Sequence, residues 1–193
     1  MENDANTDWF RSAPNIPRAK QLLKEGGYDG KPVVILQGTD WSVSRNASEI
    51  LAQQMRRAGM NAEVVAIDRA GVFKRRTSKA PPDQGGWNVF ATTSSTIDYN
   101  SPAAIYYATN GDKAWWGWPT DAKNDELRNK WVRAETNADR IRIAREIQAN
   151  AWNIVTHATF GQWVQPVAMR ANIKGVLPTT FAWARVWWNV EKV

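Results

Sequence analysis

Early in the chain a strand, a helix and a second strand follow one another, and this order limits the fold more than any other feature. Lys31 to Leu36 is a largely apolar, β-branched run of strand length. Apolar residues then recur at helical spacing from about Ser44 to Ala58, and Gly59 stands where a C-terminal cap is expected. A second strand is predicted from Ala62 to Ile67. Because two strands joined through a helix form a parallel pair with a right-handed crossover, the segment predicts an α/β fold.

Further elements are predicted on both sides of this unit. Apolar periodicity and capping residues indicate four more helices and three more strands. In chain order they are a helix from Asn15 to Gly26, a short helix at 70–78, a strand at 87–91, an irregular segment at 92–117, helices marked by Leu127 and by Ile143 after a cap at Asn137, and strands at 158–164 and 181–190. Long irregular stretches inside compact domains are usually functional loops, so 92–117 is a candidate site.

Composition excludes several classes of protein. The 193 residues fit one domain, and without cysteine neither a disulfide framework nor a zinc cage of thiolates can form. The longest apolar runs are far shorter than the about 20 residues of a membrane-spanning helix. The formal net charge of +6 leaves one alternative function, a nucleic-acid or anionic-surface module built around Lys74 to Lys79. Such a cluster is more often a solvated helix face, so we expect no nucleic acid as partner.

The sequence lacks the patterns of catalytic, metal or phosphate sites. His157 is the only histidine, so a histidine metal site or a catalytic triad would depend on one residue. No glycine-rich phosphate-binding motif is found. Asp121, Asp125 and Glu126 fall near a helix start, where carboxylates favour the helix dipole, and Glu126 can pair with Lys130. We therefore expect a non-enzymatic protein without cofactor or metal, in which His157 is structural.

The twelve tryptophans are unusual for a chain of this length. Trp131 and Trp152 fall on predicted core faces. Trp41 and the group from Trp115 to Trp118 fall in loops beyond the ends of strands or helices. Because open α/β sheets bind ligands beside the carboxyl ends of their strands, these loop rings can line a pocket. The alternative is that they cover apolar surface or form a contact between domains.

Four segments resemble, in the right order, the extracellular solute-binding proteins of ABC importers, family 5, which include peptide, nickel and glutathione binders. The resemblance covers nearly the whole chain. Its segments are the helix and turn from Pro17 to Gly30, the helix-to-strand crossover from Ala47 to Ala66, the stretch Ile97-Asp98-Tyr99-Asn100-Ser101-Pro102, which is similar to the family's Asp-Tyr-x-x-Pro, and the closing elements between Asp139 and Val176.

The resemblance implies the C-terminal lobe of a two-lobed periplasmic binding protein of type II, with a mixed sheet flanked by helices. Residues 1–14 would be a lead-in, 15–165 the ligand-binding lobe, and 166–193 a segment that returns to the missing N-terminal lobe. The ligand of such a protein is enclosed between lobes that close on a hinge. The implied partners are a membrane permease and the missing lobe. The implied location is the periplasm, with a signal peptide upstream of this segment.

The segment around Asp98 gives the most specific expectation about the ligand. In peptide-binding relatives the motif's aspartate holds the terminal ammonium of the ligand, and Asp98 occupies that position; the alternative is that Asp98 caps the turn before Pro102. At Thr93 to Thr96 the chain departs from peptide binders, which commonly carry an aromatic residue there. The ligand is therefore expected to be peptide-like or another small polar molecule. The candidate ligand-binding residues are Trp41, Ser94, Ser95, Thr96, Asp98, Tyr99, Asn100 and Trp116.

Overall fold

The computed structural model describes residues 13–162, 166, 168–177, 188 and 190–193. These residues fall into two compact units that divide between Thr92 and Thr93. The division lies at the start of the predicted irregular segment and inside the lobe predicted at 15–165. Residues beside the boundaries predicted after 14 and 165 lie partly outside the described residues, so both boundaries stay predictions.

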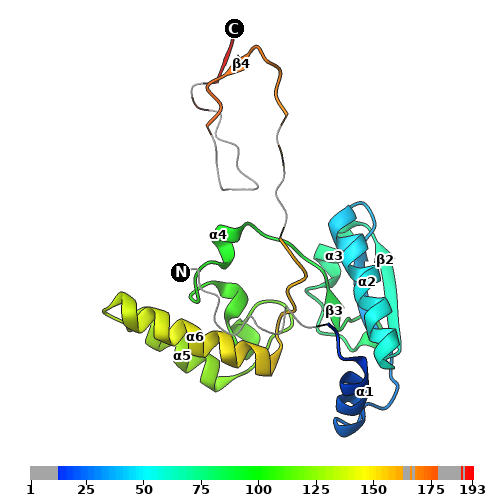
Figure 1. Cartoon of the computed structure of the whole chain (residues 1–193). Helices are drawn as coiled ribbons and strands as arrows, with labels where there is room; N and C mark the ends of the chain where they lie inside the picture. Colours follow the sequence, from blue (N-terminus) through cyan, green and yellow to red (C-terminus); the bar gives the residue numbers. More distant parts are fainter. Residues whose placement is uncertain (1–12, 163–165, 167, 178–187, 189) are drawn as a thin grey trace. The chain divides into compact units, whose positions relative to one another are not determined.

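The unit up to Thr92 is built on a three-stranded parallel sheet, whose outer strands β2 (Ala62–Ile67) and β3 (Val89–Phe90) are labelled in Figure 1. The central strand β1 (Val33–Gly38) lies between β2 and β3. The helix that crosses from β1 to β2 is α2 (Ser42–Ala58). It ends at Gly59, whose φ of 100° is a left-handed conformation that glycine adopts without steric strain. The predicted α/β class is confirmed.

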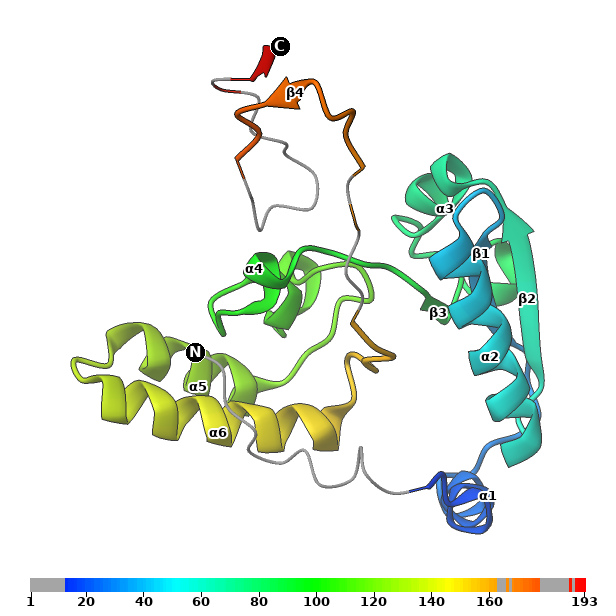
Figure 2. The same ribbon diagram turned by 45° about the horizontal axis from the view of Figure 1, so that its top comes forward.

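Alternate side chains of β1 face two separate hydrophobic clusters. Leu36 packs with Val72 of α3 (Arg69–Arg75), whereas Ile35 packs with Ala52 of α2. Successive side chains of a strand point to opposite faces of the sheet, so β1 is buried on both sides. Both Ile35 and Leu36 are 0% exposed. The sheet is therefore flanked by helices, with α2 along one face (Figure 2).

The first and third helices begin at capping side chains. In α1 (Ile16–Glu25), the Asn15 side chain accepts a hydrogen bond from the backbone N–H of Arg18 at 2.9 Å, as the sequence predicts. Asp68 caps α3 in the same way and accepts the N–H of Gly71 at 2.7 Å. These caps satisfy backbone donors that have no partner inside the helix.

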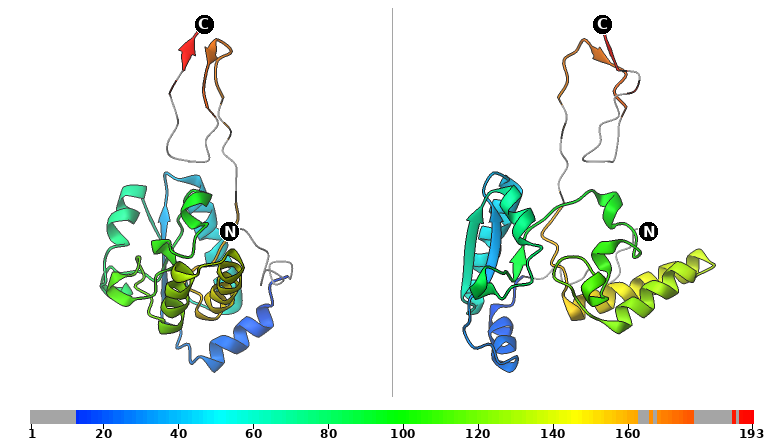
Figure 3. Two further views of the ribbon diagram at one scale, coloured as in Figure 1. Left: turned by 90° about the vertical axis from the view of Figure 1, so that its left-hand side faces the viewer. Right: turned by 180° about the vertical axis from the view of Figure 1, so that it is seen from behind.

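The unit from Thr93 onward is mainly helical (Figure 3). The helices α5 (Ala122–Arg133) and α6 (Asn137–Ile154) lie side by side around Leu127, Ile143 and Ile147, with Trp131 packed against them. The core position predicted for Trp131 is confirmed. Other elements of this unit are α4 (Thr96–Tyr99), the single 3₁₀ turns Ile105–Tyr107 and Gly111–Lys113, and the antiparallel pair β4 (Ile173–Lys174) and β5 (Glu191–Lys192).

Three details of the predicted elements are wrong. Thr136 caps α6 instead of Asn137, because Thr136 Oγ1 accepts the backbone N–H of Asp139 at 3.1 Å. Residues 158–162 do not form the strand predicted at 158–164; their side chains are exposed, and no strand pairs with them among the described residues. The irregular segment contains α4, which is too short for apolar periodicity to reveal.

Most of the strand predicted at 181–190 lies outside the described residues. Within the described part of the chain, no helix combines the length and the hydropathy that crossing a membrane requires.

Candidate functional site

The segment from Ser94 to Asn100 carries six of the eight predicted site residues and contains the single helical turn α4. The Ser94 hydroxyl donates a hydrogen bond to the Asp98 carboxylate. Ser95 precedes α4 and is 5% exposed. Thr96 is exposed, and its hydroxyl accepts a hydrogen bond from the Gln162 side-chain amide at 3.1 Å. Asn100 is exposed at the end of the turn.

Among the described residues, Asp98 has a neutral hydrogen-bond partner and no cationic one. The side chain is half-buried, and none of the ion pairs between described residues includes it. The turn at Pro102 is closed by Ser101, whose hydroxyl accepts the N–H of Ala103 at 3.2 Å. Burying a carboxylate is costly when no opposite charge is near, so the surroundings of Asp98 are compatible with a cationic ligand group, and its role in binding stays a prediction.

Tyr99 is one of five aromatic side chains that contact one another in a circular order. We call them the aromatic cluster: Tyr99, Tyr106, Trp115, His157 and Tyr107. The Tyr99 and Tyr106 rings stack with centroids 4.5 Å apart. Going on around the cluster, the centroid distances are 5.0 Å from Tyr106 to Trp115, 6.1 Å from Trp115 to His157, 6.2 Å from His157 to Tyr107 and 6.0 Å from Tyr107 to Tyr99. Such pairs stabilise one another beyond the area they bury.

Burial shifts the pKa values of three side chains of the aromatic cluster. Burial lowers the pKa of the His157 imidazole and raises the pKa of the Tyr107 phenol. Burial also raises the pKa of Tyr99 to about 12, with smaller contributions from its tyrosine neighbours and from Asp98. His157 packs between Trp115 and Tyr107, and the structural role expected for it stays a prediction. Through Tyr99 the cluster lies next to the Asp98 carboxylate.

Trp116 extends the aromatic cluster on one side. Its ring lies 4.9 Å from that of Trp115 between centroids, and its side chain is half-buried. The structure therefore brings Trp116 together with Tyr99 through Trp115 and Tyr106. Sequence reasoning missed Tyr106 and Tyr107, although they follow the family motif by only a few residues.

Trp41 lies in the unit up to Thr92. It comes three residues after the last residue of β1 and directly before α2, so it lies in the loop beyond the carboxyl end of the strand. The Arg69 guanidinium lies 4.7 Å from the centre of the Trp41 ring, a cation–π contact. Trp41 therefore covers a side chain of its own unit, which favours the structural interpretation, and its part in a ligand site stays a prediction.

The basic run from Lys74 to Lys79, which begins on α3 and continues beyond it, makes contacts inside its own unit. Arg75 donates to the carbonyl oxygens of Gly85 and Gly86 at 2.8 and 3.0 Å. The Arg76 guanidinium lies 4.2 Å from the centre of the Phe73 ring. Two of the cations in the run therefore support the fold, and the observed contacts do not favour an anionic-surface module.

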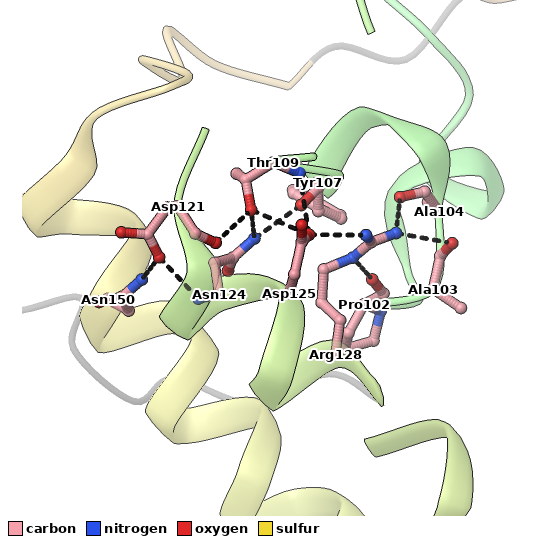
Figure 4. A network of polar contacts seen from close by, with 10 residues as sticks. All are labelled: Pro102, Ala103, Ala104, Tyr107, Thr109, Asp121, Asn124, Asp125, Arg128 and Asn150. Carbon is pink, nitrogen blue, oxygen red and sulfur yellow. Dashed lines mark hydrogen bonds and ion pairs between the residues drawn. The ribbon is translucent and has the colours of Figure 1, made fainter. Parts of the chain in front are cut away.

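A network of polar contacts connects α5 to the segment that carries the aromatic cluster (Figure 4). Asp121 caps α5 and also accepts a hydrogen bond from Asn150 of α6 at 2.9 Å. Asp125 accepts hydrogen bonds from both the backbone N–H and the hydroxyl of Thr109. The helix-start position predicted for these carboxylates is confirmed, and Glu126 pairs with Lys130 at 2.6 Å. No group of three or more potential metal-ligating side chains occurs among the residues that the structure describes.

Comparisons with known proteins agree on one family. The family model described as bacterial extracellular solute-binding proteins, family 5 Middle, matches residues 2–117. The probable peptide ABC transporter periplasmic-binding protein y4tO of Sinorhizobium fredii is 40% identical over 193 residues, which is 100% of this chain. Among solved structures, the putative peptide binding protein AppA from Clostridium difficile has a TM-score of 0.61 and 18% identity over 72% of this chain. AgaA from A. tumefaciens R10, in complex with agropinic acid, has a TM-score of 0.59 and 17% identity over 73% of this chain.

The chain spans about a third of the length of these relatives: 36% of the Sinorhizobium protein and 28% of each solved chain. At their low sequence identity the solved structures show the fold alone, which is that of the predicted two-lobed binding proteins. The family model matches more than half of the chain and includes the whole segment from Ser94 to Trp116. The family resemblance seen in the sequence is thereby confirmed, and this chain belongs to the bacterial extracellular solute-binding proteins, family 5.

Proposed function

We propose that this chain forms one jaw of the substrate-binding component of a bacterial ABC importer, with its ligand surface on α4 and the aromatic cluster. The observation that carries the proposal is Asp98, a half-buried carboxylate with only a neutral hydroxyl partner among the described residues, next to a neutral aromatic surface. A ligand that carries a cation and an apolar part fits both features. The cation would pair with Asp98, and the apolar part would lie against aromatic rings.

The relatives support a small organic ligand. The Sinorhizobium protein is described as a probable peptide-binding component, and AppA as a putative peptide binding protein, while AgaA holds agropinic acid. A peptide with a free amino terminus has the chemistry that Asp98 would recognise. Another small polar ligand with a cationic group would meet the same requirement.

The rest of the clamp comes from outside this chain. The chain spans 36% of its Sinorhizobium relative, so the other jaw and the hinge belong to the remaining part of the protein. The proposed partners are that missing N-terminal lobe, the ligand, and a membrane permease to which the loaded protein delivers it. The proposed location is the periplasm, and the proposed role is binding without catalysis.

Calorimetric titration of the full-length protein with di-, tri- and tetrapeptides tests the proposal. Asp98→Asn removes the charge and keeps the shape, so it should weaken binding by about 1–3 kcal/mol, the scale of a hydrogen bond to a charged group. Glu126→Gln is the control, because it removes an exposed carboxylate of α5 outside the candidate site. Unchanged affinity with lowered stability would identify Asp98 as a structural residue. Binding of none of the peptides would overturn the peptide assignment.

A further inference from the structure

Two of the five rings of the aromatic cluster lie on a short segment that is attached to α5 at both of its ends. The segment runs from Pro102 to Thr109 and carries Tyr106 and Tyr107. At its first end three consecutive carbonyl oxygens accept hydrogen bonds from Arg128 (Figure 4). At its last end Thr109 donates twice to Asp125.

At the first end of the segment, all three nitrogens of the Arg128 guanidinium make contacts. Arg128 Nε donates to the carbonyl of Pro102 at 2.8 Å, and one terminal nitrogen donates to those of Ala103 and Ala104 at 3.2 and 3.0 Å. The other terminal nitrogen lies 3.6 Å from the Asp125 carboxylate. Only 16% of the Arg128 side chain is exposed. A rigid planar fork that is fully used in this way fixes the direction of the groups it binds.

The contacts at the last end fix a buried residue. Thr109 is 2% exposed, and Asp125 accepts its backbone N–H at 3.1 Å and its hydroxyl at 3.0 Å. The side-chain amide of Asn124 adds hydrogen bonds to the Tyr107 carbonyl at 2.8 Å and to the Thr109 hydroxyl at 3.1 Å. Both ends of the segment are therefore held by one turn of α5.

Between these ends the segment meets α4. The Tyr107 hydroxyl donates to the backbone carbonyl of Tyr99 at 3.1 Å, and the Tyr106 ring stacks on the Tyr99 ring. Any shift of the segment relative to α5 therefore moves the rings that contact Tyr99, the residue next to Asp98.

We infer that Asp125 and Arg128 are positioning residues of the ligand site: they hold the segment 102–109 in the one place where Tyr106 and Tyr107 complete the aromatic cluster. Neither residue has to touch the ligand. Since the Arg128 guanidinium and the Asp125 carboxylate lie 3.6 Å apart, the two charges compensate each other. The consequence for ligand binding rests on the proposed function, whereas the positioning of the segment does not.

The positioning is tested without ligand, by hydrogen–deuterium exchange and near-ultraviolet circular dichroism of the full-length protein. The variants are Arg128→Ala, Arg128→Lys and Asp125→Asn, with Lys130→Ala as the control on an exposed position of the same helix. Arg128→Ala should speed amide exchange in 102–109 by at least about tenfold, because several hydrogen bonds that hold the segment are lost together. It should also weaken the aromatic dichroism signal, since the rings lose their fixed arrangement.

The conservative variant separates positioning from general damage. Lysine keeps the charge but has no fork, so Arg128→Lys should give an intermediate exchange rate, and added guanidinium ion should partly restore the signal of Arg128→Ala. The Lys130→Ala control should match the unchanged protein. Equal acceleration along α5, α6 and 102–109, or no acceleration beyond that of the control, would overturn the inference.

Peptide titration of the same variants then tests whether the position of the segment 102–109 affects peptide affinity. A loss of at least about tenfold in affinity for Arg128→Ala, with α5 and α6 still protected, supports positioning of a ligand site. Unchanged peptide affinity in a variant whose segment 102–109 is loosened would show that the segment is held for stability alone. If the unchanged protein binds no peptide, the proposed function fails, while the exchange result still decides whether the pair holds the segment.

Discussion

Asp121→Ala should destabilise the unit that begins at Thr93 by about 2–4 kcal/mol, because one carboxylate serves two helices. Asp121 Oδ1 accepts the backbone N–H of Asn124 at 2.6 Å and the side-chain amide of Asn150 at 2.9 Å. Loss of an N-cap costs about 1 kcal/mol. Asn150 is 5% exposed, so removal of its acceptor leaves a buried donor unsatisfied, at about 1–3 kcal/mol. The sum is a large fraction of a typical domain's stability.

Urea unfolding followed by far-ultraviolet circular dichroism measures the change. If the two units unfold in separate transitions, only the transition of the helical unit should move. Asp121→Asn is the matched control, because asparagine is also a good N-cap and keeps an oxygen at the same place, so most of the stability should remain. Glu126→Gln, at an exposed pair on the same helix, should leave the midpoint unchanged. A loss below about 0.5 kcal/mol for Asp121→Ala would refute the assignment of both roles to this carboxylate.

Three further predictions concern pH, backbone conformation and the isolated chain. Burial lowers the folded-state pKa of His157, so the unfolded chain takes up the proton first as the pH falls. Stability should therefore fall as the pH drops from about 7 toward the folded-state pKa. His157→Gln should flatten this dependence, measured as urea midpoints between about pH 7.5 and 5.5. Gly59→Ala should cost about 1 kcal/mol, since φ is 100° although nothing lies within 4 Å of the added Cβ; an unchanged midpoint would contradict this. The 193-residue chain alone should fold but should not bind peptides that the full-length protein binds, because a single jaw leaves much of the ligand surface in water. Equal affinities of the two proteins in calorimetry would contradict the two-jaw proposal.

The parallel sheet could be predicted from the sequence because its signals are local and repeated. The β-branched runs at 31–36 and 62–67 and the helical periodicity between them fall where β1, β2 and α2 are observed. Gly59 marked the end of α2 for a steric reason that holds in any fold. At 158–162 the same kind of local signal failed, because strand-like composition does not supply the neighbouring strand that pairing needs.

The candidate site could be predicted only where it is contiguous. Residues 94–100 were found through a motif, and α4 keeps them together. Tyr106, Trp115 and His157 are separated in sequence by up to 51 positions, and only tertiary structure brings their rings into contact. The role of Arg128 could not be predicted for another reason. On a helix, an arginine three residues after an aspartate indicates only a local ion pair. Its three carbonyl partners depend on the position of the loop 102–104, which the sequence does not give.

Two carboxylates of the unit from Thr93 onward, Asp125 and Asp98, differ in whether a cation compensates their charge. Asp125 has a cation within 3.6 Å and two donors from Thr109, so its charge and its lone pairs are used inside the unit. Asp98 has the Ser94 hydroxyl, which orients the carboxylate but leaves its charge uncompensated by any described residue. A half-buried charge of this kind lowers stability unless something pairs with it, and a cationic ligand enclosed by a second lobe would do so. On the proposed function, the neighbouring rings would shield the Asp98 carboxylate from water without competing for the cation, and the ligand's charge would then decide how strongly the jaw holds it.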